Sequence, residues 1–212
     1  MNIVVLLFTL IMMISLTSFA SSMRQLTTVS KRYPSSRTAL LSTSQPTILP
    51  RAAVAVVVQW SKNNKSLSPT TTKYLLVQRG NEPNKGMWSI PGGKIETGEG
   101  TLNAAKRELM EETGLKLNDV KWYGEGPFAC SDSIHHDMSG NIGFHYVISQ
   151  CFAEVSSSAE PAITASDDAM DARWWSAEDV QKAEDAGSVT KGVFGVISRA
   201  KLLHANGLLP CN

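Results

Sequence analysis

The residues best suited to chemistry lie between positions 93 and 115, in the sequence GKIETGEGTLNAAKRELMEETGL. Helix-forming residues run from 101 to 113, with Thr101 as the expected N-cap and Gly114 as the glycine after the C-terminal end. At about 100° per residue, the three glutamates of this helix project within an arc of roughly 100°. The sequence therefore places three carboxylates on one patch, at Glu108, Glu111 and Glu112.

Crowded carboxylates raise one another's pKa unless a cation neutralises them. A hard divalent cation such as Mg²⁺ fits such a patch, because it takes oxygen ligands from a few carboxylates and from substrate phosphates. The simpler interpretation is a solvated acidic helix face with an i, i+4 pair between Arg107 and Glu111. The full spacing favours the metal site, because nine specified positions in this register are expected by chance about once in ten million chains of this length.

The pattern of fixed residues resembles the Nudix box, which reads G-x5-E-x7-R-E-U-x-E-E-x-G-U with U an aliphatic residue. Every fixed position is filled between residues 93 and 115. The resemblance implies the α/β class, as a Nudix-type α/β/α sandwich with a mixed central β-sheet. Flanking sequences resemble the branch that contains bacterial ADP-ribose pyrophosphatases, and the likeness covers roughly residues 52 to 182: MWSIPGGK, IGFHYVISQCFAEV and DDAMDARWWSAEDV.

The same resemblance implies roles for the residues of the box, with Mg²⁺ or Mn²⁺ as the cofactor. The implied metal ligands are the carbonyl of Gly93 and the carboxylates of Glu108, Glu111 and Glu112. Arg107 orients these glutamates, and Glu99 supports the same cluster or a further metal. Glu111 or Glu112 is the expected proton acceptor during hydrolysis of a pyrophosphate linkage.

Three residues outside the box are candidate substrate contacts. Arg79 lies on a predicted strand that leads toward the box and is a candidate phosphate contact. Trp88 is a candidate contact for a base, although packing explains it equally well. His145 lies on a strand predicted after the box, where it is expected to face a polar pocket and touch substrate.

Two polar segments contain residue types that could support further chemistry. The HHD sequence at residues 135 to 137 has no partner at a recognised zinc spacing, so it is predicted to be a solvated loop. The acidic segment further along the chain offers candidate bases for a second site at Asp167, Asp168 and Asp171. Acidic loops are usually only solvated, so that alternative stays open.

The flanking sequence predicts the elements that position the box. The valine-rich residues 52 to 60 predict a buried strand, and residues 73 to 79 predict the strand that returns after a polar loop. Apolar residues between 190 and 206 recur at i, i+3, i+4 and i+7, which predicts an amphipathic helix that packs on the core or forms a homodimer contact. Further strands are expected at residues 87 to 90, 120 to 127 and 143 to 155, and around Trp174 and Trp175, with a short helix from near Ser176.

Composition divides the chain into a presequence and a domain. Residues 51 to 185 are predicted to be the hydrolase domain, and residues 186 to 212 its C-terminal amphipathic helix. Residues 1 to 50 lack Asp and Glu and resemble the bipartite presequence of algae with secondary plastids. A signal peptide of about residues 1 to 20 precedes a transit-like segment at 21 to 50, which favours a plastid; secretion, a mitochondrion or a signal anchor are the alternatives.

The charge and cysteine content limit the partners of the mature protein. The formal net charge of +1 hides an uneven distribution, because all 19 acidic residues follow residue 81. The hydrolase domain is thus mildly acidic, which gives no electrostatic reason to expect long nucleic acid as a partner. Three cysteines without CxxC spacing indicate neither a zinc knuckle nor a disulfide framework. A small nucleotide is the expected substrate, and no stable membrane span is expected in the mature protein.

Three functions remain open from the sequence. The first is hydrolysis of ADP-ribose or a similar nucleoside diphosphate derivative, and the second is a nucleoside triphosphate pyrophosphatase of the pool-sanitising type. The third is a non-catalytic binding module, which the three intact carboxylates disfavour. The proline that typical ADP-ribose enzymes carry beyond the box is absent, since Cys130 and Ser131 stand there. The sequence therefore predicts the reaction better than the substrate.

Overall fold

The structure is a computed structural model that describes residues 48–62, 72–155 and 157–211. The predicted signal peptide and nearly all of the predicted transit-like segment lie outside the described residues. Residues 48 to 50 precede the first strand without regular structure. No helix within the described ranges is long and apolar enough to cross a membrane.

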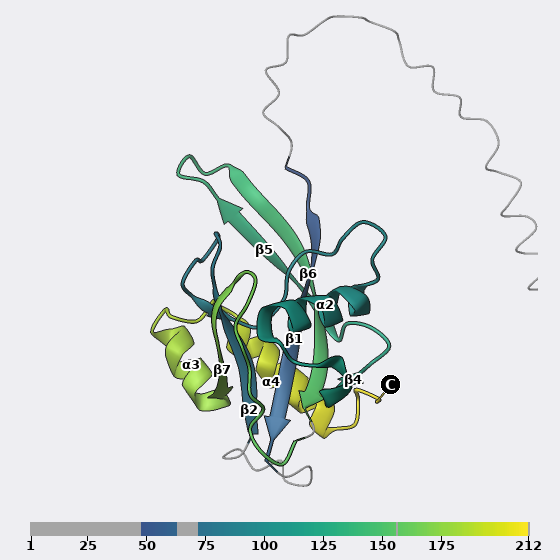
Figure 1. Cartoon of the computed structure of the whole chain (residues 1–212). Helices are drawn as coiled ribbons and strands as arrows, with labels where there is room; N and C mark the ends of the chain where they lie inside the picture. Colours follow the sequence, from purple (N-terminus) through teal and green to yellow (C-terminus); the bar gives the residue numbers. More distant parts are fainter. Residues whose placement is uncertain (1–47, 63–71, 156, 212) are drawn as a thin grey trace, which may run out of the picture. The chain divides into compact units, whose positions relative to one another are not determined.

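A seven-stranded mixed sheet forms the centre of the fold (Figure 1). Its strands are β1 (Arg51–Ser61), β2 (Thr72–Arg79), β3 (Trp88–Ser89), β4 (Val120–Tyr123), β5 (Ala129–His136), β6 (Ile142–Val155) and β7 (Ala169–Ser176). The strand order is β3-β2-β1-β6-β4, while β7 also pairs with β2 and β5 with β6. β1 and β6 run parallel, and every other pair of strands in the described chain is antiparallel. The mixed sheet expected from the sequence is confirmed.

The central strand β1 is buried on both faces. Val56 and Val58 belong to one hydrophobic cluster, whereas Ala55 and Val57 belong to the cluster on the opposite face. Successive side chains of a strand point to opposite faces, so a strand covered on both sides needs an unbroken apolar run. This requirement explains the valine-rich sequence that predicted the strand.

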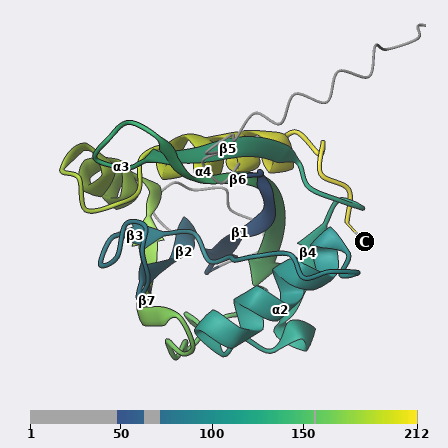
Figure 2. The same cartoon turned by 90° about the horizontal axis from the view of Figure 1, so that it is seen from above.

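Helices cover both faces of the sheet (Figure 2). They are α2 (Thr101–Thr113), α3 (Ala177–Asp185) and α4 (Val193–Ala205). α2 packs Ala105 and Leu109 into the cluster on one face, and α4 packs Ile197 and Ala200 into the other. The layers are therefore helix, sheet and helix, which confirms the predicted α/β/α sandwich.

The C-terminal helix agrees closely with the expectation for residues 190 to 206. Its buried residues are Val193, Ile197 and Ala200, so core packing accounts for the apolar stripe. Leu202 lies on the exposed side of the same helix. A homodimer contact stays a prediction.

The sequence predicts a solvated loop around His135 and His136, and this prediction is wrong. The segment forms β5, which pairs with β6 from Ala129 opposite Gln150 to His136 opposite Ile142. Residues within β5 alternate between half-buried and exposed, and the strand has no fully buried position. Because the half-buried face is mostly polar, the segment lacks the apolar alternation by which a strand is recognised.

Two element ends also differ from the expectation. The N-cap of α2 is Gly100 and not Thr101, which is already the first helical residue. Gly114 does follow the helix in the left-handed region, at a φ of 67°. β4 ends at Tyr123, short of the predicted residue 127, and Gly124 follows with a φ of 80°.

The segment between β3 and α2 lies along β1 and so brings the box to the sheet. The amide of Val54 donates to the carbonyl of Gly93 at 2.9 Å, and the amide of Val56 donates to that of Pro91 at 2.8 Å. A Cβ at Gly92 would lie 2.2 Å from the carbonyl oxygen of Val54. Only glycine permits this close approach of the two backbones.

Candidate active site

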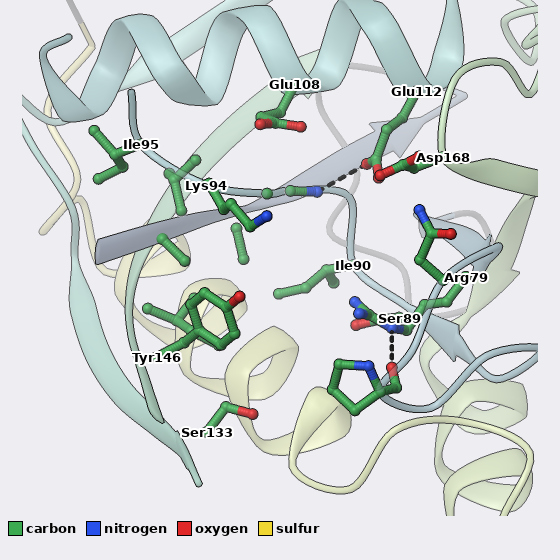
Figure 3. A pocket seen from close by; sticks show the side chains of 18 of the residues that line it. Arg79, Ser89, Ile90, Lys94, Ile95, Glu108, Glu112, Ser133, Tyr146 and Asp168 are labelled. Atoms are coloured by element: carbon green, nitrogen blue, oxygen red, sulfur yellow. Dashed lines mark hydrogen bonds between the residues drawn. The ribbon is translucent and has the colours of Figure 1, made fainter. Parts of the chain in front are cut away.

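A pocket of about 990 Å³ opens beside the N-terminal half of β1, which is at the upper end of the range for ligand sites (Figure 3). Helix α2 contributes the acidic wall, and Figure 3 shows Glu108 and Glu112 pointing down from it. Tyr146 and Ser133 lie on one side of the pocket in this view, and Arg79 lies on the other. The pocket thus continues in two directions from the carboxylates.

Arg107 connects the glutamates of the box. Its Nη1 donates to Glu108 at 2.8 Å and to Glu111 at 3.0 Å. Its Nε and Nη2 each donate to Glu99 at 2.9 Å. The hydrogen bonds from Arg107 also lower the pKa of Glu99 and keep that carboxylate ionised. One guanidinium therefore bonds to three carboxylates, and its role in orienting them during catalysis stays a prediction.

Glu112 is a buried carboxylate with an unusually high pKa. Burial raises its pKa to about 8, and the charges of Glu108 and Asp168 act in the same direction. The amide of Gly92 donates to Glu112 Oε2 at 2.8 Å, and this bond and the charge of Arg79 only partly oppose the rise. A carboxyl in this state takes up a proton near neutral pH in the absence of a cation.

Glu108 lies directly against the glycine turn. A Cβ added at Gly93 would lie 2.5 Å from the Glu108 carboxylate, so any other residue at this position would displace it. Burial raises the pKa of Glu108, despite the hydrogen bond from Arg107. Glu111 differs from its neighbours, because its side chain is 40% exposed at the rim of the pocket.

The donor atoms fit a hard divalent cation. They are carboxylate oxygens and a backbone carbonyl, which Mg²⁺ and Mn²⁺ prefer. The buried Glu108 and Glu112 both have raised pKa values, as expected for carboxylates that are not fully compensated by nearby cations. In the described part of the chain, no three His, Cys, Asp or Glu side chains converge as a preformed metal cage. Arg107 holds Glu108 and Glu111 in their present positions, so the fit rests on donor chemistry and burial.

Of the three candidate substrate contacts, only Arg79 lines the pocket. Arg79 lines the pocket, and its Nε donates to the carbonyl of Pro83 at 2.9 Å. Trp88 lies in the core, with its ring 5.2 Å from that of Trp175, so packing explains this residue. His145 faces the opposite side of β6, and its Nε2 lies 2.9 Å from an oxygen of Asp132 on β5. The expectation that His145 faces the pocket is wrong. The next residue, Tyr146, lines the pocket instead.

The three candidate bases of the acidic segment also differ in whether they line the pocket. Asp167 and Asp168 line the pocket. Asp171 is turned toward Arg173, whose Nε donates to its Oδ2 at 2.8 Å. Only two of the three candidate bases are therefore near the carboxylates.

Some pocket residues have no strong signal in the sequence. Tyr146 and Ile148 alternate with His145 on β6, but a strand predicted over residues 143 to 155 does not tell which of its faces meets the pocket. Ser133 and His135 belong to β5, which the sequence did not predict. Lys94 adds a cationic side chain near the turn.

Comparisons with known proteins agree with this geometry. A family model described as NUDIX domain matches residues 49–193. The m7GpppN-mRNA hydrolase of Xenopus laevis is 48% identical over 69 residues, which are 32% of this chain and 21% of that protein. The ADP-ribose pyrophosphatase of Methanocaldococcus jannaschii is 51% identical over 43 residues, which are 20% of this chain and 25% of that protein. The chain thus spans a quarter or less of the length of these two relatives.

Solved structures share the fold at low sequence identity. The C. elegans Ap4A hydrolase, in a binary complex, has a TM-score of 0.55 and 17% identity, over 74% of this chain and 98% of that chain. The NUDIX domain of Shewanella oneidensis NrtR, complexed with ADP ribose, has a TM-score of 0.54 and 22% identity, over 76% and 94%.

Proposed function

The chain belongs to the Nudix hydrolase family, and on that premise we propose that it hydrolyses the pyrophosphate linkage of a nucleoside diphosphate derivative resembling ADP-ribose. The observation that carries this proposal is the position of the carboxylates. Glu108, Glu111 and Glu112 line a pocket to which Arg79 and Lys94 contribute cationic side chains. Carboxylates and cations on the walls of one pocket suit a bound metal and the phosphates that it contacts.

The divalent cation is proposed to be held by the three glutamates of α2 and the carbonyl of Gly93. Mg²⁺ or Mn²⁺ supplies charge neutralisation at the phosphate oxygens and makes phosphorus a better electrophile. Arg107 bonds to Glu108 and Glu111 and so limits the rotation of both side chains near the turn at Gly93. The chain supplies the oxygens and their orientation.

Proton transfer is proposed to involve Glu112. The amide of Gly92 fixes one of its carboxylate oxygens, which orients the group in the pocket. The Glu112 side chain is buried in the pocket, whereas that of Glu111 is 40% exposed. The fixed orientation and burial of Glu112 favour it over Glu111 as the acceptor of the proton of the attacking water.

The shape of the pocket favours a substrate with bulky groups on both sides of the diphosphate. The pocket extends from the carboxylates toward Tyr146 on one side and toward Arg79 on the other (Figure 3). A nucleoside triphosphate has a bulky group at one end only. The ADP ribose bound to the Shewanella oneidensis domain and the name of the Methanocaldococcus jannaschii relative also support the ADP-ribose-like choice.

A substrate panel tests the proposal against the triphosphatase alternative. We expect kcat/KM for ADP-ribose to exceed that for dGTP and 8-oxo-dGTP by about tenfold or more at equal Mg²⁺, equivalent to about 1.4 kcal/mol in transition-state binding. An advantage of that size for either triphosphate, with pyrophosphate as a product, would favour the pool-sanitising function. The panel should include a cap dinucleotide, because one relative is a cap hydrolase.

A further inference from the structure

The last turn of α2 is hydrogen-bonded to the segment that precedes β7. The final carbonyls of a helix have no partner within the helix and need one elsewhere. The amide of Thr164 donates to the carbonyl of Thr113 at 3.0 Å, and the amide of Ser166 donates to that of Glu112 at 3.2 Å. The hydroxyl of Ser166 donates to the carbonyl of Glu111. Ser166 therefore bonds to α2 twice, once through its backbone and once through its side chain.

The two carbonyls that Ser166 binds belong to proposed ligands of the cation. Glu111 and Glu112 both line the pocket, while their backbone carbonyls accept from Ser166. Ser166 itself is exposed to solvent and lies outside the pocket lining. Its two bonds thus fix the segment before β7 to the helix that carries the glutamates, and they do so from outside the pocket.

A tight turn follows Ser166 and brings two aspartates to the pocket. The amide of Ala169 donates to the carbonyl of Ser166 at 3.1 Å, which closes the turn. Within the turn, Asp167 has a φ of 53°, in the left-handed region that residues with a Cβ disfavour. The amide of Gly80, directly after β2, donates to the carbonyl of Asp168 at 2.8 Å. The turn is thus held at α2 and beside β2, with Asp167 and Asp168 in the pocket lining.

The charges of the two aspartates reach the glutamates of α2. Burial is the main cause of the raised pKa of Glu108, and the charge of Asp167 adds to the rise. Burial likewise raises the pKa of Glu112 to about 8, with a further contribution from the charge of Asp168. Figure 3 shows Asp168 beside Glu112. Because like charges repel, each carboxylate that the turn keeps near the glutamates strengthens the attraction of this wall for a cation.

We propose that Ser166 is a positioning residue that holds Asp167 and Asp168 near the glutamates of α2 and so increases the affinity of the pocket for a divalent cation. Ser166 acts through the two aspartates, since it lies outside the pocket lining itself. Without its hydroxyl, the strained turn loses one of its two bonds to α2 and can relax away from the pocket. The inference rests on the proposed function, in which the glutamates of α2 hold the cation.

Calorimetric titration of the metal-free protein with Mg²⁺ tests the role of Ser166 without requiring hydrolysis. We expect Ser166→Ala to raise the Kd for Mg²⁺ by about fivefold, the size of effect that one hydrogen bond supports. Ser166→Thr keeps a hydroxyl and should bind Mg²⁺ within about twofold of the unaltered protein. At saturating Mg²⁺, kcat of Ser166→Ala should fall by less than about twofold, because the missing bond alters cation affinity and leaves every pocket side chain in place.

A matched control and a double-mutant cycle separate positioning from a general structural effect. Ser188 is also exposed, and its hydroxyl donates to the carbonyl of Ala183 at the end of α3, at 3.1 Å. Ser188→Ala should bind Mg²⁺ as the unaltered protein does. The combined variant Asp167→Asn/Asp168→Asn should weaken Mg²⁺ by about tenfold, and adding Ser166→Ala to it should have no further effect. This lack of additivity is the specific sign that Ser166 acts through the aspartates.

Normal Mg²⁺ affinity in Ser166→Ala would overturn the inference, and so would an equal loss of affinity when Ser166→Ala is added to the aspartate variant. Loss of the cooperative thermal transition in Ser166→Ala would assign Ser166 to folding and would also contradict positioning. The outcomes separate the inference from the proposed function. If Mg²⁺ affinity depends on Ser166 but ADP-ribose is not hydrolysed, the inference stands and the proposed function fails. If ADP-ribose is hydrolysed and Mg²⁺ affinity does not depend on Ser166, only the inference fails.

Discussion

At the scale of single residues, the site depends on carboxylates that the fold places out of water. Glu108 and Glu112 are buried, and each has a raised pKa because burial disfavours its charged form. Arg107 partly compensates this cost for Glu108. The remaining uncompensated charge is what a divalent cation would neutralise.

Glu112→Gln is expected to lower kcat by about 10² or more, because it removes both a charged ligand and the proposed proton acceptor. Steady-state assays with ADP-ribose at saturating Mg²⁺ measure this effect. Glu178→Gln, at an exposed position in the first turn of α3, serves as the control and should leave kcat unchanged. Nearly normal turnover by Glu112→Gln would remove Glu112 from the mechanism.

Gly93→Ala is expected to weaken Mg²⁺ binding and activity together, because the new methyl group would lie 2.5 Å from the Glu108 carboxylate. A titration with Mg²⁺, monitored by activity or by calorimetry, measures the change in Mg²⁺ affinity. Gly195→Ala in α4 is a matched control, since its Cβ meets no described atom within 4 Å. That control should keep full activity and gain up to about 1 kcal/mol in stability, because alanine favours the helix.

The raised pKa of Glu112 predicts how pH affects stability. Its folded pKa of about 8 lies above the ordinary value of 4.5, so the folded state binds the proton more tightly between these limits. The metal-free protein should therefore lose stability as the pH rises from about 4.5 to about 8. Because a cation binds the deprotonated form, Mg²⁺ should raise Tm more at pH 8.5 than at pH 6. Equal shifts at both pH values, or the same pH dependence in Glu112→Gln, would contradict this account.

At the scale of elements, α2 must pack on the sheet on one side and present carboxylates on the other. Leu109 is fully buried in the core, while Met110 next to it is 46% exposed. Leu109→Ala should lower the free energy of unfolding by about 2 to 5 kcal/mol. Met110→Ala should change it by no more than about 0.5 kcal/mol. Chemical denaturation of both variants measures the difference, and similar costs would show that α2 is packed differently.

The sequence predicts this helix and its glutamates well, because spacing along a helix determines which residues share a side. It predicts the opposite wall of the pocket poorly. The sequence predicts that His145 faces the pocket, whereas Tyr146 lines it, because a strand alone does not show which face meets the pocket. The sequence does not predict β5, because its polar, half-buried residues resemble a loop in composition, and only pairing with β6 makes it a strand.

At the scale of the whole molecule, the pocket draws on segments from across the described domain. β1, the turn at Gly93, α2, the β5–β6 hairpin and the acidic segment before β7 all contribute to its lining. Long-range packing therefore determines the shape of the pocket, whereas the proposed metal ligands come from one short segment. Import into a plastid and formation of a homodimer stay predictions.

The proposed function requires metal-dependent cleavage of a pyrophosphate linkage at the carboxylates of α2. The most direct measurement incubates the protein with ADP-ribose, with Mg²⁺ and with excess EDTA, and identifies the products by chromatography. We expect AMP and ribose 5-phosphate in equal amounts with Mg²⁺, and no turnover in EDTA. Full turnover in EDTA, or no AMP in the presence of Mg²⁺ or Mn²⁺, would contradict the account.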